Sequence, residues 1–356
     1  MKVHNFNPGP SILPKEVLEK TAEAVVELNS GGMSLLEVSH RGKPFMDIME
    51  RSRSLIKELL NVPENYSVLF LQGGASLGFY ISAVNFMKTN GKSAYVKTGE
   101  WAGKAYKEAK MVGNAIAIAS SEDKNYSYIP KGYSIPSDAD YLHLTSNNTI
   151  FGTQYKTFPS SPVPVLCDMS SDIFSRKIDA SKFALIYAGA QKNMGPAGTT
   201  IYIVNKDLLG KTGRQIPSML DLQIHIKGES MFNTPPVFAI YVCMLTLEWL
   251  KKLGGVNAME KINRQKADLL YNEIDNNPLF KGTAAKEDRS DMNVTYILTN
   301  EKLKDEFDKM WKAAGINGLT GHRSVGGYRA SIYNALPMES VQILVDVMSE
   351  FGKKFG

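Results

Sequence analysis

The chain has 356 residues, of which 43% are hydrophobic and 10% aromatic, as is usual for a globular enzyme. This length exceeds what one compact core usually fills, so we expect two domains. The 41 basic and 36 acidic residues leave a net charge of +5, and no block of Lys and Arg stands out. The composition therefore disfavours a nucleic-acid-binding protein.

The two cysteines and the chain's apolar stretches indicate its compartment. Cys167 and Cys243 both lie in apolar runs and are too few for a disulfide framework, so we predict buried, reduced thiols. Residues 1–10 lack the apolar core of a signal peptide. The longest apolar stretch, 236–250, is too short to span a bilayer and suits a buried helix that begins after two prolines. The sequence predicts a cytoplasmic protein with no membrane partner.

The first 205 residues alternate between helical and strand patterns. Helices are predicted over 14–28, 46–60, 76–87 and 102–111. Strands are predicted over 67–71, 93–96, 115–119, 141–144, 163–168, 183–187 and 200–204. This alternation indicates an α/β fold with a mostly parallel sheet sandwiched by helices.

A glycine pair, Gly254-Gly255, follows the helix predicted over 236–253 and marks a candidate boundary. The remaining pattern predicts a smaller α+β domain, with helices over 257–274 and 301–314, strands over 292–298 and 328–333, and a last helix. We expect a large domain over 14–255 and a small C-terminal domain over 256–356. The N-terminal segment 1–13 is expected to pack near the small domain.

The most informative residues are a lysine and an aspartate at two predicted strand ends. Lys192 follows the strand over 183–187 inside a Gly/Ala-rich turn, and Asp168 ends the strand over 163–168. Burial disfavours a charged ammonium, which suits a lysine that condenses with an aldehyde as a Schiff base. A carboxylate nearby could hold a proton on a pyridine nitrogen. The pair predicts a pyridoxal phosphate enzyme, and the alternative for Lys192 is a solvated loop lysine.

A glycine turn at Gly73-Gly74 is the first companion of this pair. It lies between a predicted strand and a predicted helix that begins near Ala75 and Ser76. Free backbone N–H groups and the positive end of the helix dipole suit a phosphate. The motif matches neither a nucleotide P-loop nor GxGxxG, and a plain left-handed turn is the alternative.

Further candidates are Trp101 and Thr149, each next to a predicted strand or helix end. Trp101 could stack on an aromatic cofactor or simply pack. Thr149 follows the strand over 141–144, at the carboxyl end where ligands of open α/β sheets gather. Asn233-Thr234 is most simply a helix N-cap, but its side chains could equally contact a phosphate.

Two clusters of histidine and arginine indicate an anionic substrate. The first is His40-Arg41, and the second is His322-Arg323 with Arg329 in the small domain. Guanidinium groups bind carboxylate and phosphate bidentately, so the clusters suggest a small dianion or trianion between domains. Surface salt bridges are the alternative. No spacing of His, Cys or carboxylates indicates a metal site.

Taken together, these motifs resemble those of the phosphoserine aminotransferase family, whose members are fold-type I pyridoxal phosphate enzymes. The resemblance runs nearly from end to end. Its most specific motif is the stretch over 321–335, which separates this family from other aminotransferases of the fold. The matching motifs are 6–10, 39–42, 73–76, Trp101, 147–149, 168–171, 190–193, 233–235 and 321–335.

The resemblance implies a role for each matching residue. Lys192 would bind the pyridoxal phosphate aldehyde, Asp168 the pyridine nitrogen, and Trp101 would stack on the ring. The other cofactor-binding residues implied are Thr149, Ser170, Ala75, Ser76 and Gln191 from one subunit, with Asn233 and Thr234 from the other. The implied substrate-binding residues are His40, Arg41, His322, Arg323 and Arg329. Some family members carry an arginine in the glycine turn, where this chain has Ala75-Ser76.

The implied enzyme is a homodimer that transfers an amino group from glutamate to 3-phosphohydroxypyruvate in serine biosynthesis. A related phosphorylated hydroxythreonine serves the pathway to pyridoxine in some bacteria. Two other classes stay open. One is another fold-type I enzyme, such as a cysteine desulfurase or an alanine–glyoxylate aminotransferase. The other is a non-catalytic phosphate-binding or cofactor-carrying protein, which would have little need for Arg41, Arg323 and Arg329.

Overall fold

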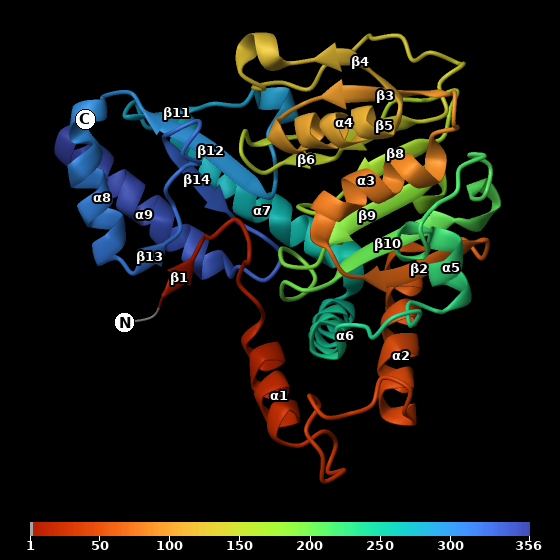
Figure 1. The fold of residues 1–356 in the computed structure, drawn as a ribbon. Helices are drawn as coiled ribbons and strands as arrows, with labels where there is room; N and C mark the ends of the chain where they lie inside the picture. Colours follow the sequence, from red (N-terminus) through yellow and green to blue (C-terminus); the bar gives the residue numbers. More distant parts are fainter. Residues whose placement is uncertain (1–2) are drawn as a thin grey trace.

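The computed structural model describes residues 3–356, so the first two residues of the predicted N-terminal segment lie outside it. A seven-stranded sheet with the order β2-β10-β9-β8-β5-β3-β4 forms the centre (Figure 1). Its strands are β2 (Tyr66–Leu71), β3 (Lys92–Lys97), β4 (Asn114–Ser120), β5 (Leu142–Thr145), β8 (Val165–Asp168), β9 (Leu185–Gly189) and β10 (Thr200–Asn205). Strand β10 runs antiparallel to β2 and β9, while β9, β8, β5, β3 and β4 pair in parallel.

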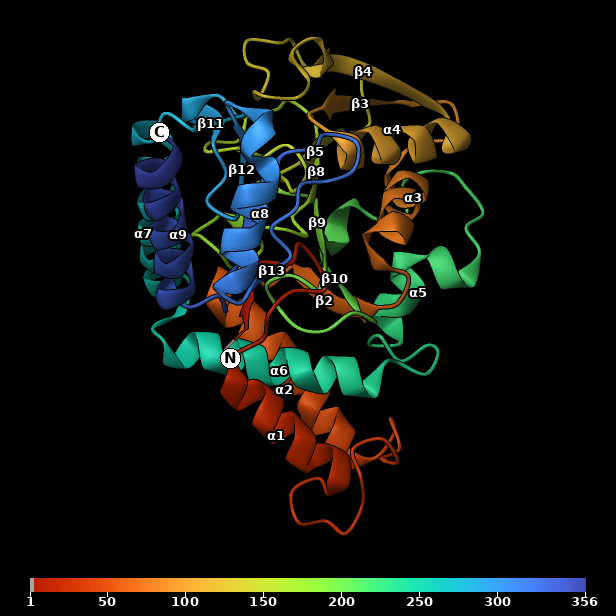
Figure 2. The ribbon, with the colours of Figure 1, turned by 90° about the vertical axis from the view of Figure 1, so that its left-hand side faces the viewer.

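Helices cover both faces of this sheet because successive strand residues alternate between two apolar cores. In β2, for example, Val68 and Phe70 belong to one core, and Leu69 and Leu71 to the other. The core containing Leu69 is covered by α3 (Gly74–Phe86), α4 (Glu100–Val112) and α5 (Leu222–Lys227). The opposite core is covered by α1 (Lys15–Val26), α2 (Lys43–Leu60) and α6 (Val237–Lys252) (Figure 2).

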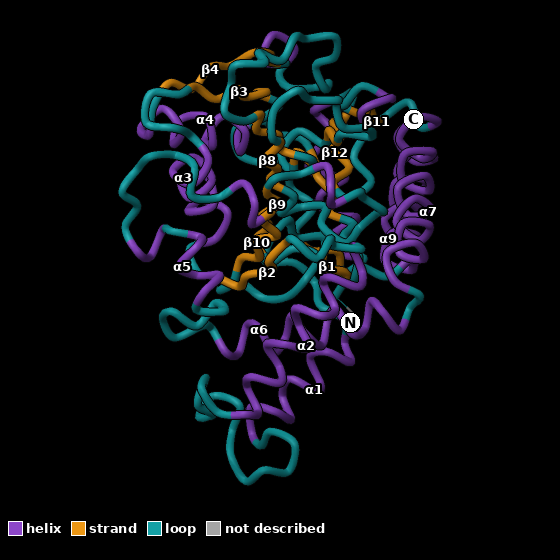
Figure 3. The backbone as a smooth tube through the Cα atoms, turned by 90° about the vertical axis from the view of Figure 1, so that its right-hand side faces the viewer, coloured by secondary structure: helices purple, strands orange, loops and turns teal. Residues whose placement is uncertain are grey.

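The C-terminal part of the chain builds a third core around a small antiparallel sheet with the order β11-β12-β14. Its strands are β11 (Phe280–Gly282), β12 (Asn293–Leu298) and β14 (Tyr328–Ser331), and its helices are α7 (Gly255–Asn276), α8 (Lys304–Ala313) and α9 (Met338–Phe355). Helices α7 and α9 pack side by side (Figure 3). Near the N-terminus, β1 (His4–Asn5) pairs in parallel with β13 (Ile316–Asn317), and Phe6 is buried in this third core.

The predicted α/β fold class with a mostly parallel, helix-covered sheet is confirmed, and each of the seven predicted large-sheet strands is present. The elements that the sequence did not predict are short: β1, β11, β13, α5 and the hairpin of β6 (Asn147–Asn148) and β7 (Thr153–Gln154). The division at 255/256 stays a prediction, because α7 begins there but contributes to both adjoining cores. None of the helices described is long and apolar enough to cross a membrane.

Candidate active site

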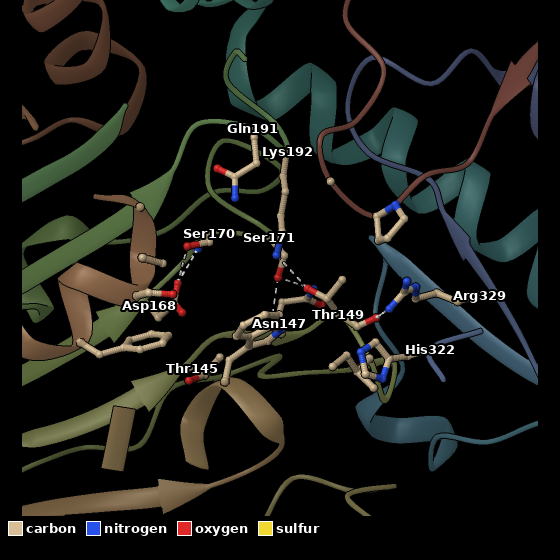
Figure 4. Close-up of a pocket in the computed structure, with 18 residues that line it drawn as sticks. Thr145, Asn147, Thr149, Asp168, Ser170, Ser171, Gln191, Lys192, His322 and Arg329 are labelled. Atoms are coloured by element: carbon tan, nitrogen blue, oxygen red, sulfur yellow. Dashed lines mark hydrogen bonds between the residues drawn. The ribbon is translucent and has the colours of Figure 1, made fainter. Parts of the chain in front are cut away.

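A cavity of about 290 Å³ lies at the carboxyl ends of β5, β8 and β9, beside the N-terminus of α3 (Figure 4). Three parts of the chain that are distant in sequence form its wall. They are the N-terminal segment, the large sheet with its turns, and strand β14 with the loop that precedes it. The lining residues are Pro8, Gly9, Gly74, Ala75, Ser76, Phe79, Trp101, Thr145, Asn147, Thr149, Ile150, Asp168, Ser170, Ser171, Gln191, Lys192, His322 and Arg329.

Lys192 extends into this cavity from the turn that follows β9. Its Nζ lies 3.0 Å from the hydroxyl oxygen of Thr149 and 5.9 Å from the centroid of the Trp101 ring. The pKa of Lys192 is lowered to about 8, chiefly by burial and also by the charge of Arg329, while the charge of Asp168 opposes the shift. About a tenth of this amine is therefore unprotonated at pH 7, far more than for an ordinary lysine, as a nucleophile or general base requires.

Asp168 ends β8 and is 5% exposed, so its orientation depends on the hydrogen bonds it accepts. Its Oδ1 accepts from the backbone N–H of Ser170 at 2.9 Å and from the Ser170 hydroxyl at 2.6 Å. Burial raises the pKa of Asp168, while the two Ser170 bonds and the charge of Lys192 lower it. The bonds to Oδ1 leave Oδ2 available to a group that enters the cavity.

The turn before α3 needs glycine at Gly73, where φ is +98°. A Cβ at this residue would lie 2.4 Å from the Leu77 side chain. The first hydrogen bond of the helix joins the N–H of Leu77 to the Gly73 carbonyl, so the N–H groups of Ala75 and Ser76 remain free of the helix ladder. These groups at a helix N-terminus form a seat for an anion.

Trp101, in the first turn of α4, supplies a flat wall of the cavity. Lys104, one turn further along the same helix, places its Nζ 4.6 Å from the centroid of the indole ring. Cation–π attraction of this kind favours one orientation of the ring. Lys104 also lies 3.6 Å from the carboxylate of Glu100, so its charge is partly balanced.

Arg329 and His322 line the side of the cavity contributed by the third core. The Arg329 side chain is buried, and its Nη1 donates to the Thr149 carbonyl at 3.4 Å. Burial lowers the pKa of Arg329. The pKa of His322 is also lowered, first by burial and then by the charges of Arg329 and Arg323. This side of the cavity therefore suits an anion.

Ten of the residues predicted from the sequence line this cavity: Ala75, Ser76, Trp101, Thr149, Asp168, Ser170, Gln191, Lys192, His322 and Arg329. The other five do not: His40, Arg41, Asn233, Thr234 and Arg323. His40 and Thr234 instead line a separate hollow on the outside of the chain, beside Phe238. Arg41 and Arg323 are exposed.

The interpretation of Asn233-Thr234 as a helix cap is wrong. The N-cap of α6 is Pro236, and no side chain caps the helix. The two residues pack instead against Gln72, just before the glycine turn. Asn233 donates to the Gln72 side chain at 2.9 Å, and the Gln72 amide donates to the Thr234 carbonyl at 3.2 Å. They therefore lie near the predicted phosphate seat but outside the cavity of their own chain.

Several lining residues were not predicted as site residues: Pro8, Gly9, Phe79, Thr145, Asn147, Ile150 and Ser171. The N-terminal segment crosses the Lys192 turn, where the Ser11 N–H donates to the Gln191 carbonyl at 2.9 Å. A Cβ at Gly9 would lie 3.5 Å from Cγ of Lys192, which shows how closely this segment covers the lysine. Thr145 offered a weak sequence signal, since it follows a predicted strand. Pro8 and Gly9 belong to the matching motif 6–10, but no site role was predicted for them.

The cysteines are both free and buried, as predicted. Burial raises the pKa of Cys167 and of Cys243, so neither thiol has the character of an activated nucleophile. A cysteine desulfurase requires an exposed, reactive thiol, and this chain offers none.

This fold and this cavity are those of a pyridoxal phosphate transferase, and the chain belongs to the class V aminotransferase family, which it matches over residues 3–344. It is 64% identical to a phosphoserine aminotransferase of Flavobacterium psychrophilum over 355 residues, covering 99% of this chain and 100% of the relative. A solved phosphoserine aminotransferase from Bacillus circulans subsp. alkalophilus superposes with a TM-score of 0.97 at 45% identity, over 100% and 99% of the two chains. A PLP-bound phosphoserine aminotransferase from Trichomonas vaginalis superposes with a TM-score of 0.93 at 36% identity, over 98% and 100%.

Proposed function

We propose that the chain is a phosphoserine aminotransferase of serine biosynthesis, with pyridoxal 5′-phosphate as its cofactor. It transfers the amino group of L-glutamate to 3-phosphohydroxypyruvate, giving O-phospho-L-serine and 2-oxoglutarate. The observation that carries the proposal is one cavity that joins Lys192 and Asp168 to a buried Arg329. A cofactor carrier would need the first two residues but would have little use for the third.

The residues present fit the cofactor in size, charge and shape. Lys192 offers an amine with a pKa of about 8 for the aldehyde. Asp168 has a free carboxylate oxygen for the pyridine nitrogen, and the Trp101 ring offers a stacking surface. The N–H groups of Ala75 and Ser76, with the Gln191 side chain, offer donors to the phosphate. The bound cofactor would supply an electron sink for the negative charge that develops when the substrate α-carbon loses its proton.

Lys192 is the residue proposed to move the proton. With its Nζ inside the cavity, 3.0 Å from the Thr149 hydroxyl, the Lys192 amine would act as general base for the proton on the substrate α-carbon. Its lowered pKa keeps enough of it unprotonated to accept a proton near pH 7. Thr149 lies within hydrogen-bonding distance at 3.0 Å and orients this amine. The buried Asp168 carboxylate, oriented by Ser170, would hold a proton on the pyridine nitrogen of the bound cofactor.

Substrate anions are bound by Arg329 and the histidine–arginine loop beside it. Arg329 takes the α-carboxylate that glutamate and phosphoserine share. His322 and Arg323 face the distal anion, a carboxylate in one substrate and a phosphate in the other. The lowered pKa of His322 leaves it neutral near pH 7, so it acts there as a hydrogen-bonding group while the arginines supply the charge. Arg41 is predicted to bind this same distal anion, and His40 is predicted to bind substrate.

His40, Arg41, Asn233 and Thr234 do not line the cavity of their own chain, so their proposed roles require a second copy. We propose an isologous homodimer in which these residues complete the partner's site. We also propose that the large domain, over 14–255, holds the cofactor, and that the enzyme works in the cytoplasm. Use of a phosphorylated hydroxythreonine in pyridoxine biosynthesis is a second candidate activity, because its distal phosphate would meet the same groups.

One assay tests the function against its rivals. Purified, cofactor-loaded protein is mixed with phosphoserine and 2-oxoglutarate, and glutamate is measured. Parallel reactions contain alanine with glyoxylate, and cysteine with a sulfide detector. We expect glutamate from phosphoserine at a rate well above the other two reactions. Preferred turnover of alanine with glyoxylate, or release of sulfide, would overturn the proposal in favour of another enzyme of the fold.

A further inference from the structure

Lys266 lies near the middle of α7 and is completely buried without a carboxylate partner. Its ammonium donates to three backbone carbonyls, those of Ile332 at 2.9 Å, Tyr333 at 2.7 Å and Leu336 at 3.2 Å. All three acceptors belong to the short segment 332–336 that follows β14. One side chain therefore donates to three carbonyls of this segment, and of these the Tyr333 carbonyl also accepts the Leu336 N–H.

This arrangement is expensive to maintain and is not needed for packing alone. An ammonium taken out of water loses its hydration, and carbonyl dipoles replace only part of it. Burial accordingly lowers the pKa of Lys266 to about 7. Helix α7 packs most of its buried face with apolar residues such as Leu270 and Ile274, and a methionine would fill a similar volume at position 266.

The segment held by Lys266 contacts the candidate active site at two points. The Asn334 N–H donates to the side chain of Asn193, the residue after Lys192, at 3.0 Å. The Tyr333 hydroxyl donates to the carbonyl of Pro8, which lines the cavity, at 2.8 Å. A second residue of α7, Asn263, lies one turn before Lys266 and donates to the Asn334 side chain at 2.8 Å.

The same segment also anchors the strand that carries Arg329. Strand β14 has four residues and lies at the edge of its three-stranded sheet, so the β12 ladder supports it on one side. On the other side, it is held by single backbone hydrogen bonds. The Arg329 N–H donates to the Leu319 carbonyl, and the Ser331 N–H donates to the Phe6 carbonyl. An edge strand this short needs an anchor at its end if a side chain in it is to keep a fixed position.

We infer that Lys266 is a positioning residue, which clamps segment 332–336 and thereby fixes Arg329 relative to Lys192 for binding of the substrate α-carboxylate. The inference rests on the role proposed above for Arg329. Lys266 touches neither substrate nor cofactor and acts through the backbone of β14. Its loss should therefore weaken substrate binding more than it slows the chemistry at saturation.

The test is Lys266→Met, which keeps the volume but removes all three donors. Leu270→Ala is the matched control: it lies one turn further along α7, destabilises the same core and leaves the clamp intact. Two quantities are measured on each cofactor-loaded protein. The first is amide hydrogen exchange at Asn334 and Leu336, without substrate. The second is KM and kcat for phosphoserine. If Lys266→Met does not fold, Lys266→Gln, a shorter and uncharged side chain, is measured in its place.

We expect the exchange at Asn334 and Leu336 to rise at least about tenfold in Lys266→Met, and KM to rise about tenfold while kcat changes by less than about threefold. Leu270→Ala should lose stability but keep KM within about twofold of the original chain. Unchanged amide hydrogen exchange in Lys266→Met, or equal KM values in the two variants, would refute the proposed positioning role of Lys266. Failure of the unmodified enzyme to transaminate phosphoserine would instead overturn the proposed function and leave the exchange result standing.

Discussion

The hydroxyl of Ser170 lies 2.6 Å from Oδ1 of Asp168, and the same hydroxyl accepts the N–H of Gly189 at 3.1 Å. Because the Gly189 N–H occupies an acceptor position, the hydroxyl proton is directed at the carboxylate. Ser170 therefore links the ends of β8 and β9, the strands that present Asp168 and Lys192. One serine thus orients the carboxylate and stabilises its charged form.

Replacing Ser170 with alanine should impair the reaction without unfolding the protein. A hydrogen bond to a charged group contributes roughly 1.5–3 kcal/mol, so a loss of about ten- to a hundredfold in rate is expected if the transition state uses it fully. The rate of a single glutamate half-reaction measures this. Ser93→Ala is the control, since Ser93 is a buried serine of the same sheet that lies at the start of β3, whereas the cavity lies at the carboxyl ends of the strands. Equal rates in the two variants would show that the Ser170 bond has no catalytic role.

The reactivity of Lys192 should depend on pH with a midpoint near 8. In protein stripped of cofactor, the amine is protonated and unreactive below its pKa of about 8 and free above it. The rate of covalent labelling by pyridoxal phosphate, fixed with borohydride, should rise about tenfold per pH unit below this value and then level off. Lys192→Ala should take no label at this position. Peptide mapping that finds the label on a different lysine would contradict the assignment.

Arg323 and Arg329 should respond differently to the two substrates. Both substrates share the α-carboxylate, so Arg329→Ala should damage the glutamate and phosphoserine half-reactions alike. The phosphate has more charge and more acceptor oxygens than the γ-carboxylate, so Arg323→Ala should affect phosphoserine more. Each lost charge-assisted bond should cost about ten- to a hundredfold in affinity. Single-turnover kinetics of each half-reaction measures these losses. If Arg323→Ala slows the glutamate and phosphoserine half-reactions equally, Arg323 does not bind the substrate phosphate.

The shared-site homodimer predicts a specific effect at Thr234. Its side chain is exposed and caps no helix, so Thr234→Ala should change the free energy of unfolding by less than about 0.5 kcal/mol. If the Thr234 side chain contacts the partner's cofactor, however, the Thr234→Ala protein should lose its cofactor faster on dialysis. Thr299→Ala, an exposed threonine after β12, is the control. Light scattering should give a dimer, and a fully active monomer would refute the shared site.

The sequence could predict the large sheet because its strands carry local signals. Each buried strand is an apolar run bounded by polar or glycine residues, and β9 is recognised from its own residues alone. The pairs β1–β13 and β6–β7 have two residues per strand and no such signal. Their pairing depends on contacts between segments that are distant along the chain.

The candidate site divides in the same way. Lys192 and Asp168 were predictable because a strand and its following turn position each of them. Pro8 and Gly9 were not, because contacts that are distant in sequence bring their segment to the cavity. The Pro8 carbonyl accepts a hydrogen bond from the Tyr333 hydroxyl, and the Ser11 N–H donates to the Gln191 carbonyl. The exposed Arg41 and Arg323 carry chemistry that a sequence motif identifies, but a single chain does not bring them into the cavity. A substrate or a second copy of the chain would have to supply the missing contact.

Helix α7 belongs to two cores. Val256 and Met259, in its first turns, are buried with the large sheet, whereas Leu270 and Ile274 are buried with the small one. Loss of either core on heating would deprive α7 of half its packing and would pull on the segment that Lys266 holds. A chain of this size with separate cores would ordinarily melt in stages. Because α7 packs in both cores, we expect the two cores to unfold together, so that neither melts on its own.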